Sequence, residues 1–307
     1  MDRRNFLNAA TAAPFMNAAT AASCFAQTLY APKGKPAVYT GPHRPHTKLS
    51  ELKAKHKGEK SWRELIVDDK HLRSEYLYLA PGQGHPKALH PDTRAWWVVM
   101  EGEVRFTFET QAPFVARKGS IVQVPYQTLF EYEVAGSVPA LIFETNVAGA
   151  KTLYANRKDA PEMPGHEWME VDVRAREIGK WQRGNKPHTT YDELAAKLEK
   201  GELKGTLRIV EDDRGTANFI YGYNSKLPPL DEKVRGHYHP EGAEYWLVMS
   251  GQIRYPIEKV GVVIAEAGDV VYVPAYTWHA PRWWGEGPSC RLAMNGFPYI
   301  SHLFDPH

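Results

Sequence analysis

The stretch "HYHPEGAEYWLVMSGQ", residues 237–252, repeats the pattern of an earlier stretch, "ALHPDTRAWWVVMEGE", residues 88–103. One ungapped alignment with a separation of 149 residues extends well beyond both stretches and keeps glycines and prolines in place. A chance similarity does not hold one register in this way, so the chain contains an internal duplication. The identical pairs are His90 and His239, Pro91 and Pro240, Trp97 and Trp246, Met100 and Met249, Gly102 and Gly251, Arg105 and Arg254, Gly119 and Gly268, Val122 and Val271, Pro125 and Pro274, and Thr128 and Thr277.

A second block repeats at a separation of 142 residues: "HTKLSELKAK" begins at His46 and "HTTYDELAAK" at His188. Both blocks predict short helices, and the second has a capping-box pattern from Thr190 to Glu193. The runs that follow, such as "EYWLVMSG" and "DVVYVPA", are β-branched or aromatic and end at Gly or Pro, which is typical of short strands. The sequence therefore predicts an all-β chain of two antiparallel barrels or sandwiches with short flanking helices. The unequal separations indicate an insertion or deletion among the connecting strands.

The 307 residues have an ordinary globular composition, with 43% hydrophobic and 24% charged residues, and are enough for two domains. The formal charge is only +2 and no Lys/Arg block dominates, so the sequence favours neither nucleic acid nor an anionic membrane surface as a partner. No stretch beyond the N-terminus is long and apolar enough to predict a membrane span.

Residues 1–26 resemble a twin-arginine export signal, because Arg3 and Arg4 precede a mildly apolar Ala/Thr stretch. This resemblance implies export of the folded protein by the twin-arginine machinery, to the periplasm or outside the cell. A flexible Ala-rich terminus and a lipoprotein with Cys24 lipidated remain alternatives. The mature chain would keep only Cys290, which excludes an intramolecular disulfide and a cysteine-based zinc site.

Four residues with metal-binding side chains follow one another at short spacing in the second copy. His237 and His239 share one face of a strand, because side chains two residues apart point the same way. The Pro-Glu-Gly-Ala turn at 240–243 breaks the strand and lets Glu244 rejoin the face of the histidines. His279 ends the hairpin "GDVVYVPAYTWH" and is the expected fourth partner. The set predicts a metal site, with polar surface residues as the alternative.

This spacing resembles the two motifs of the cupin superfamily, G-x5-H-x-H-x3-4-E-x6-G and G-x5-P-x-G-x2-H-x3-N. The resemblance covers about residues 75–150 and 215–300 and implies a bicupin, with two double-stranded β-helix barrels of the jelly-roll type. Tyr276 replaces the motif glycine and Trp283 the final asparagine, which puts the turn geometry in question and leaves the ligands intact. The implied domains are the signal at 1–26, an N-terminal cupin at 40–150, a connection at 151–187 and a C-terminal cupin at 188–307.

The resemblance also implies roles for individual residues. The implied metal ligands are His237, His239, Glu244 and His279, with Glu244 also handling protons. The equivalent residues of the first copy are Ala88, His90, Ala95 and Phe130, so the N-terminal cupin is predicted to be metal-free unless His85 substitutes for a lost ligand. We expect one divalent transition metal per chain, with Fe(II) or Mn(II) favoured and Zn, Ni or Cu left open.

Aromatic and basic residues on neighbouring strands are candidates for a substrate pocket. The predicted lining residues are Trp246, Tyr221, Tyr223, Trp278 and Arg291. Trp246 matches Trp97 of the first copy, which favours a role in the barrel core and leaves the pocket wall as the alternative. By strand alternation, Tyr238 and Tyr245 are predicted to point away from the metal ligands.

These patterns give one leading hypothesis and two alternatives. The leading hypothesis is an exported dioxygenase-type oxidoreductase that acts on a small organic substrate, aromatic compounds included. The first alternative is a cupin lyase or isomerase that uses its metal as a Lewis acid. The second is a periplasmic protein that binds a sugar or another small molecule and holds a structural metal. A homodimer is a further expectation, because oligomers are common among cupins.

Overall fold

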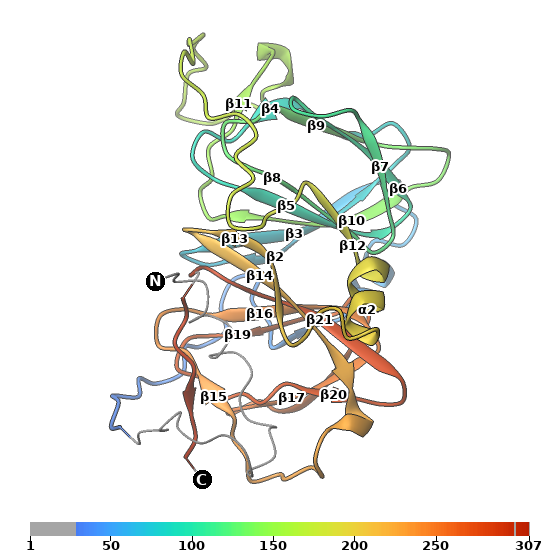
Figure 1. Cartoon of the computed structure of the whole chain (residues 1–307). Coiled ribbons are helices and arrows are strands. Elements are labelled where there is room, and N and C mark those ends of the chain that lie inside the picture. The colour runs from blue at the N-terminus through green and yellow to red at the C-terminus, as the bar shows by residue number, and fades with distance from the viewer. Residues whose placement is uncertain (1–28, 298, 307) are drawn as a thin grey trace, which may run out of the picture.

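The computed structural model describes residues 29–297 and 299–306, which form two β-barrels stacked on each other (Figure 1). The predicted export signal, with Arg3 and Arg4, lies outside the described residues. None of the described helices is long and apolar enough to cross a membrane.

The first barrel consists of a six-stranded and a five-stranded antiparallel sheet. The six-stranded sheet has the order β12 (His188–Thr190), β8 (Ser120–Val124), β5 (Ala95–Glu101), β10 (Ala140–Val147), β3 (Leu72–Leu79) and β2 (Trp62–Asp68). The five-stranded sheet has the order β11 (Leu153–Tyr154), β4 (Gly84–Leu89), β9 (Phe130–Val134), β6 (Glu103–Phe108) and β7 (Phe114–Arg117).

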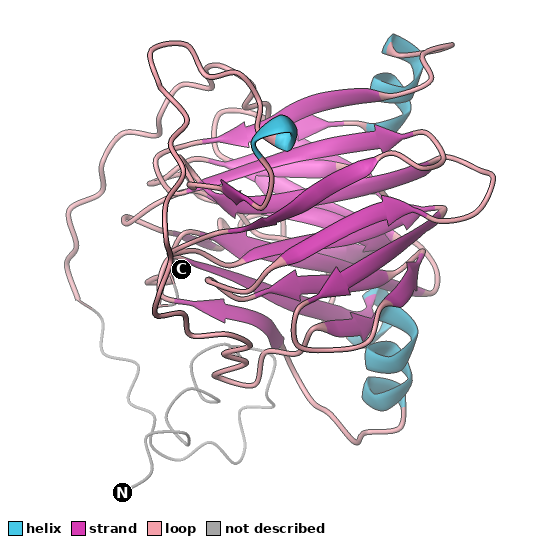
Figure 2. Cartoon of the chain, turned by 90° about the horizontal axis from the view of Figure 1, so that it is seen from above, coloured by secondary structure: helices cyan, strands magenta, loops and turns pink. Residues whose placement is uncertain are grey.

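The second barrel has the same plan, with a six-stranded sheet opposite two smaller ones. The six-stranded sheet has the order β1 (His46–Thr47), β19 (Val270–Val273), β16 (Glu244–Ser250), β21 (Pro288–Asn295), β14 (Gly215–Tyr223) and β13 (Leu207–Asp212). The smaller sheets are β18 (Gly261–Glu266), β17 (Gln252–Ile257) and β20 (Arg282–Trp284), and the pair β15 (His237–Tyr238) and β22 (Leu303–Phe304). The predicted all-β fold with two tandem barrels is confirmed, and Figure 2 shows the layered strands from above.

Three apolar cores explain why the central strands β5 and β16 are hydrophobic along most of their length. One core fills each barrel, and a third lies between the two six-stranded sheets. In β5, Trp96 faces the shared core and Trp97 the first barrel. In β16, Tyr245 faces the shared core and Trp246 the second barrel. Because both faces of these strands are buried, neither alternates between apolar and polar residues.

Each repeat begins with a short strand that joins the sheet of the other barrel. β1 pairs with β19, with His46 opposite Val271, and β12 pairs with β8, with His188 opposite Val122. These are equivalent positions of the duplication, so the exchange is reciprocal. Each barrel therefore contains one strand from the other sequence repeat.

The two predicted helices follow these exchanged strands. They are α1 (Leu49–Lys55) and α2 (Tyr191–Glu199). Thr190 is the N-cap residue of α2, and its hydroxyl accepts a hydrogen bond from the backbone N–H of Glu193 at 3.1 Å, as the capping-box pattern predicts. Two 3-10 helices complete the helical turns of the described residues, η2 (Arg157–Asp159) and η3 (Asn224–Lys226).

The length difference between the two copies lies mainly after β14. In the first copy β3 ends at Leu79 and β4 begins at Gly84, whereas in the second β14 ends at Tyr223 and β15 begins only at His237. The longer loop contains η3 and reaches the sheet of β17 and β20 through Glu232, which forms an ion pair with Arg254. The insertion therefore covers the outer face of the second barrel.

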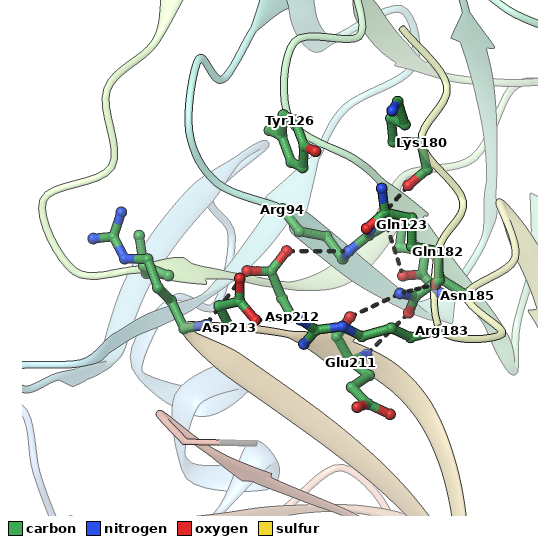
Figure 3. Close-up of polar contacts among 12 residues, drawn as sticks. Arg94, Gln123, Tyr126, Lys180, Gln182, Arg183, Asn185, Glu211, Asp212 and Asp213 are labelled. Atoms are coloured by element: carbon green, nitrogen blue, oxygen red, sulfur yellow. Dashed lines mark hydrogen bonds and ion pairs between the residues drawn. The ribbon is translucent and has the colours of Figure 1, made fainter. Parts of the chain in front are cut away.

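A buried arginine anchors the connection between the repeats at 151–187. Arg94 is 3% exposed and donates hydrogen bonds to Gln123 Oε1 at 3.3 Å and to the carbonyl oxygen of Lys180 at 3.4 Å (Figure 3). Its guanidinium also lies 3.5 Å from the carboxylate of Asp212 in β13. One side chain of the first barrel thus holds both the connection and the edge of the second barrel.

Replacing Trp96 with alanine tests whether the shared core joins the barrels. We expect Trp96→Ala to lower the free energy of unfolding by about 3–5 kcal/mol, because it empties the contact between the six-stranded sheets. Denaturant titration followed by circular dichroism measures this loss. The matched control is Val262→Ala, whose side chain is 53% exposed and whose expected effect is below about 0.5 kcal/mol. Equal losses in the two variants would contradict the shared core.

Candidate metal centre

Three histidines and one glutamate meet inside the second barrel. His237 begins β15, His239 follows that strand, Glu244 begins β16, and His279 lies in the turn after β19. Their potential ligand atoms all lie within 4.8 Å of one another. His239 Nε2 is 3.0 Å and His279 Nε2 is 3.5 Å from Glu244 Oε2. The structure thus brings together the four residues that the motif spacing selects.

Backbone pairing fixes two of these histidines relative to each other. The N–H of His237 donates to the carbonyl oxygen of His279 at 3.0 Å, and the N–H of His279 donates to the carbonyl oxygen of His237 at 3.0 Å. Gly236 precedes this bridge with a φ of +81°, and a Cβ at this position would lie 2.1 Å from the carbonyl oxygen of His279. Only glycine allows this close approach. The bridge therefore depends on the residue directly before the first ligand.

The ring orientation of the other ligands is fixed by carbonyl oxygens. His239 Nδ1 donates to Ser301 O at 2.7 Å, and His279 Nδ1 donates to Thr277 O at 2.8 Å. With Nδ1 engaged, Nε2 of both rings faces the cluster, as in protein metal sites where a second hydrogen bond orients the ligand. His279 Nε2 is buried and has no hydrogen-bond partner among the described residues, so its lone pair is available to an ion.

Burial and mutual contacts set the protonation of the cluster. Burial, and then the neighbouring His279, lowers the pKa of His237, so this imidazole is neutral. Burial raises the pKa of Glu244, but the hydrogen bond from His239 and the nearby ring of His279 outweigh burial and hold that pKa well below its ordinary value. Burial lowers the pKa of His239, but the Glu244 hydrogen bond outweighs it and raises the pKa. A metal would replace the proton shared by His239 and Glu244.

These donors fit a divalent transition metal. Ligand atoms at about 2.1 Å from one ion stand at most about 4.2 Å apart, so the observed spread of 4.8 Å needs only a small contraction. Three imidazoles and one carboxylate suit iron, manganese, nickel, copper, cobalt or zinc. A six-coordinate ion held by these four side chains would keep two positions for solvent or substrate.

The residue that replaces the motif glycine keeps the turn geometry. Tyr276 has a φ of +61°, and its counterpart in the first barrel, Gln127, has a φ of +59°. Both copies therefore make the left-handed turn without glycine, at a cost of about 1–2 kcal/mol. The N–H of Tyr276 donates to the carbonyl oxygen of His239 at 2.8 Å, which ties the turn to the metal ligands.

Sequence reasoning missed one histidine beside the cluster. The ring of His302 lies 4.5 Å from that of His239 and 4.9 Å from that of His237, measured between centroids. It arrives on the C-terminal segment, where β22 pairs with β15 and Ser301 orients His239. No spacing signal links His302 to the cupin motifs, because only the tertiary fold returns this segment to the site.

Two of the five predicted pocket residues lie inside the second barrel with the cluster. The ring of Trp246 lies 5.2 Å from the ring of His279 and 5.1 Å from that of Tyr255, and it belongs to the barrel core. Arg291 pairs with Val248 in the sheet and lies on the interior face of β21, because Ala293 on that face belongs to the barrel core. Trp246 thus has both of the roles that the sequence left open, core residue and neighbour of a ligand.

The other three predicted pocket residues lie away from the cluster. The hydroxyls of Tyr221 and Tyr223 both donate to Glu199 Oε1 at 2.6 Å, at the end of α2. They occupy the opposite face of β14 from Ile220, which packs into the barrel core. Trp278 packs edge-on against Tyr238 at 4.8 Å, on the side of the chain opposite His279. These contacts direct the three side chains toward Glu199 and Tyr238 rather than toward the ligand cluster.

The residues predicted to point away from the ligands do so. Tyr238 contacts Trp278, and the Tyr245 hydroxyl forms a hydrogen bond of 2.7 Å with Ser74 Oγ in the shared core.

In the first barrel the positions equivalent to three ligands hold Ala88, Ala95 and Phe130, at most 1% exposed. The fourth holds His90, whose Nδ1 donates to the carbonyl oxygen of Lys151 at 3.0 Å. His85 stacks on Phe130 with ring centroids 5.0 Å apart.

Comparisons with known proteins agree with this architecture. The cupin domain family (Cupin_2) matches residues 75–146 and 225–294, one segment in each barrel. Each of the two barrels thus contains a cupin domain. No curated protein matches it significantly.

Solved structures share the bicupin fold at low sequence identity. A variant of salicylate 1,2-dioxygenase from Pseudoaminobacter salicylatoxidans superposes with a TM-score of 0.62 and 13% identity, covering 90% of each chain. A complex of that enzyme with gentisate gives a TM-score of 0.61 and 13% identity, covering 85% of each chain. A Cupin 2 conserved barrel domain protein from Leptotrichia buccalis gives a TM-score of 0.52 and 13% identity, covering 82% of this chain and 95% of that one.

Removal of one ligand tests the centre directly. We expect His279→Ala to lower the affinity for a divalent metal at least about tenfold, because the ring supplies one of four donors. Metal content after dialysis, measured by mass spectrometry of the elements, gives the result. The control is His90→Ala in the first barrel, which should retain the metal. If both variants lose the metal equally, or neither does, the assignment of the centre to the second barrel is wrong.

Proposed function

We propose that this bicupin is a metal-dependent oxidoreductase of the dioxygenase type, which adds both atoms of one O2 molecule to a small organic substrate. One observation carries the proposal: a buried cluster of three histidines and one glutamate stands beside Trp246 inside one barrel. In the other barrel, three of the four equivalent positions are apolar and filled by core side chains. Because the polar cluster occurs in one copy of the fold and not in the other, it serves a chemical function rather than the folding of the barrel.

The chain's own residues supply binding, orientation and exclusion of water. When bound, an iron or manganese ion supplies redox and Lewis-acid chemistry. Glu244 is the carboxylate of the cluster and is the candidate to accept and return a proton during turnover. The ring of Trp246, packed on His279, closes the apolar side of the site against water.

The comparison with salicylate 1,2-dioxygenase supports the choice of reaction class as a starting hypothesis. The identity of 13% carries the fold alone, so the substrate of that enzyme is not transferred to this chain. A lyase or isomerase that uses the same ligands with zinc stays the rival hypothesis, and the role of oxygen separates the two.

Oxygen consumption by the iron-loaded protein tests the proposal. Across a panel of phenols, catechols, diketones and thiols, we expect at least one substrate to be consumed with one O2 per molecule, as an oxygen electrode and product mass spectrometry measure. Glu244→Ala should abolish the consumption, since it removes both a metal donor and the proton acceptor. The absence of oxygen consumption with iron, manganese, nickel and copper on every substrate would refute an oxidoreductase. Undiminished anaerobic turnover with zinc would instead support the lyase or isomerase.

We also propose that the protein is exported by the twin-arginine pathway. Residues 1–26, with the Arg3-Arg4 pair, support this proposal. A double variant, Arg3→Lys with Arg4→Lys, is expected to remain in the cytoplasm as the full-length chain, which cell fractionation and intact mass would reveal. Lys33→Arg, outside the predicted signal, is the control and should be exported normally. Unchanged export of the double variant would overturn the proposal.

A further inference from the structure

Three arginines of the described chain are less than a tenth exposed, and they differ in their partners. Arg94 contacts the carboxylate of Asp212, and Arg254 donates to Glu232 Oε2 at 2.5 Å. Arg291 is 9% exposed, and its Nε and Nη1 are buried without a hydrogen-bond partner among the described residues. A buried charge without a partner is strongly unfavourable. The first two arginines are therefore explained by the fold, and Arg291 is not.

Two further donors in the same barrel lack partners. The hydroxyl of Tyr255 and Nε1 of Trp283 are buried and make no hydrogen bond with any described residue. Both side chains pack into the core of the second barrel, where Trp246 lies 5.1 Å from Tyr255. Burial raises the pKa of Tyr255, so its phenol keeps the proton and can donate it in a hydrogen bond. The barrel thus contains several enclosed donors and no acceptor paired with them.

The first barrel shows that the fold does not need these groups. Its sheets have the same register, yet the equivalent positions are apolar and its core is filled. The equivalent pairs are Arg291 and Ile142, Tyr255 and Phe106, Trp283 and Val134, and Gly222 and Leu79. Gly222 makes room for the ring of Trp283, because a Cβ on this glycine would lie 2.6 Å from that ring. The copy that carries the metal ligands is therefore also the copy that gained the donors.

We propose that Arg291, together with Tyr255 and Trp283, forms an anion subsite that holds the carboxylate of a small organic-acid substrate beside the metal ligands. This inference rests on the proposed function and adds the chemical class of its substrate. Arg291 pairs with Val248 in the sheet and faces the same barrel interior as Trp246, whose ring lies 5.1 Å from that of Tyr255 and 5.2 Å from that of His279.

The charge balance favours a carboxylate over a phosphate. A guanidinium provides one positive charge and a planar set of donors that matches a carboxylate. A phosphate ester carries close to two charges at neutral pH and needs more donors than this barrel offers. Arg291 keeps a small exposed surface although β21 is a central strand, so a solvent-sized space reaches it.

Calorimetric binding of small acids to the zinc-loaded protein tests the subsite without turnover. The probes are acetate, oxalate and benzoate, with benzamide as the uncharged equivalent of benzoate and inorganic phosphate as the competing anion. We expect at least one carboxylate to bind, benzoate to bind more tightly than benzamide, and phosphate to bind more weakly than the carboxylates. Arg291→Met should weaken carboxylate binding by about 10–100-fold and leave metal content unchanged.

Stability separates a ligand-binding arginine from a structural one. Arg291→Met should raise the melting temperature by about 2–4 °C, because it removes an uncompensated buried charge. The matched control is Arg254→Met, which should lower the melting temperature and leave carboxylate binding unchanged, because it breaks the ion pair with Glu232. Tyr255→Phe removes only a hydroxyl and should weaken carboxylate binding about 3–10-fold with the melting temperature unchanged or higher.

Several outcomes would overturn the subsite. These are the absence of carboxylate binding, equal binding by Arg291→Met and wild type, and tighter binding of phosphate than of any carboxylate. If Arg291→Met loses both binding and stability, Tyr255→Phe decides: unchanged binding in that variant refutes the proposal. Since zinc supports no oxidation, these results are independent of oxygen consumption, and either proposal can fail without the other.

Discussion

The apolar layer between the two six-stranded sheets is the contact on which the rest of the molecule depends. It contains Trp96 from one barrel together with Tyr245 and Leu247 from the other, and it buries the second face of the central strands β5 and β16. Strand alternation then assigns the residues of β16 from Glu244 to Val248, before the irregularity near its end, either to this shared layer or to the barrel interior. Glu244 and Trp246 face the interior because Tyr245 and Leu247 are committed to the layer.

The two copies of the fold differ in what fills the barrel interior. In the first barrel, aromatic and aliphatic side chains fill the interior, and the positions equivalent to the ligands hold Ala88, Ala95 and Phe130. The second barrel replaces part of that filling with imidazoles, a carboxylate and unpaired donors. Such an interior is less favourable for folding than a fully apolar one. The exchanged strands and the shared layer connect the second barrel to the first, whose interior is filled by apolar side chains.

The second barrel contains two sets of buried polar groups that need ligands of opposite charge. The ligand cluster holds one ionised carboxylate among three histidines. Arg291 Nε and Nη1, the Tyr255 hydroxyl and Trp283 Nε1 have no acceptor among the residues that the structure describes. A cation completes the first set and an anion completes the second. A substrate acid that bridges them would satisfy both, since it brings negative charge into a barrel whose own acceptors are few. The buried polar groups of this barrel are therefore fully paired only when both a cation and an anion are bound.

The sequence by itself determined the duplication, the all-β class, the N-cap of α2 and the four clustered residues, because these depend on local spacing and on strand alternation from a known turn. It did not determine which face of β14 carries Tyr221 and Tyr223, since the stretch Ile220-Tyr-Gly-Tyr has no charged residue to mark an outer face. Only the tertiary structure decided the exchange of β1 and β12, the return of His302 to the cluster, and the burial of Arg291 Nε and Nη1 without a hydrogen-bond partner in the described part of the chain. Each of these is a contact between residues distant in sequence, and short-range periodicity carries no information about such contacts.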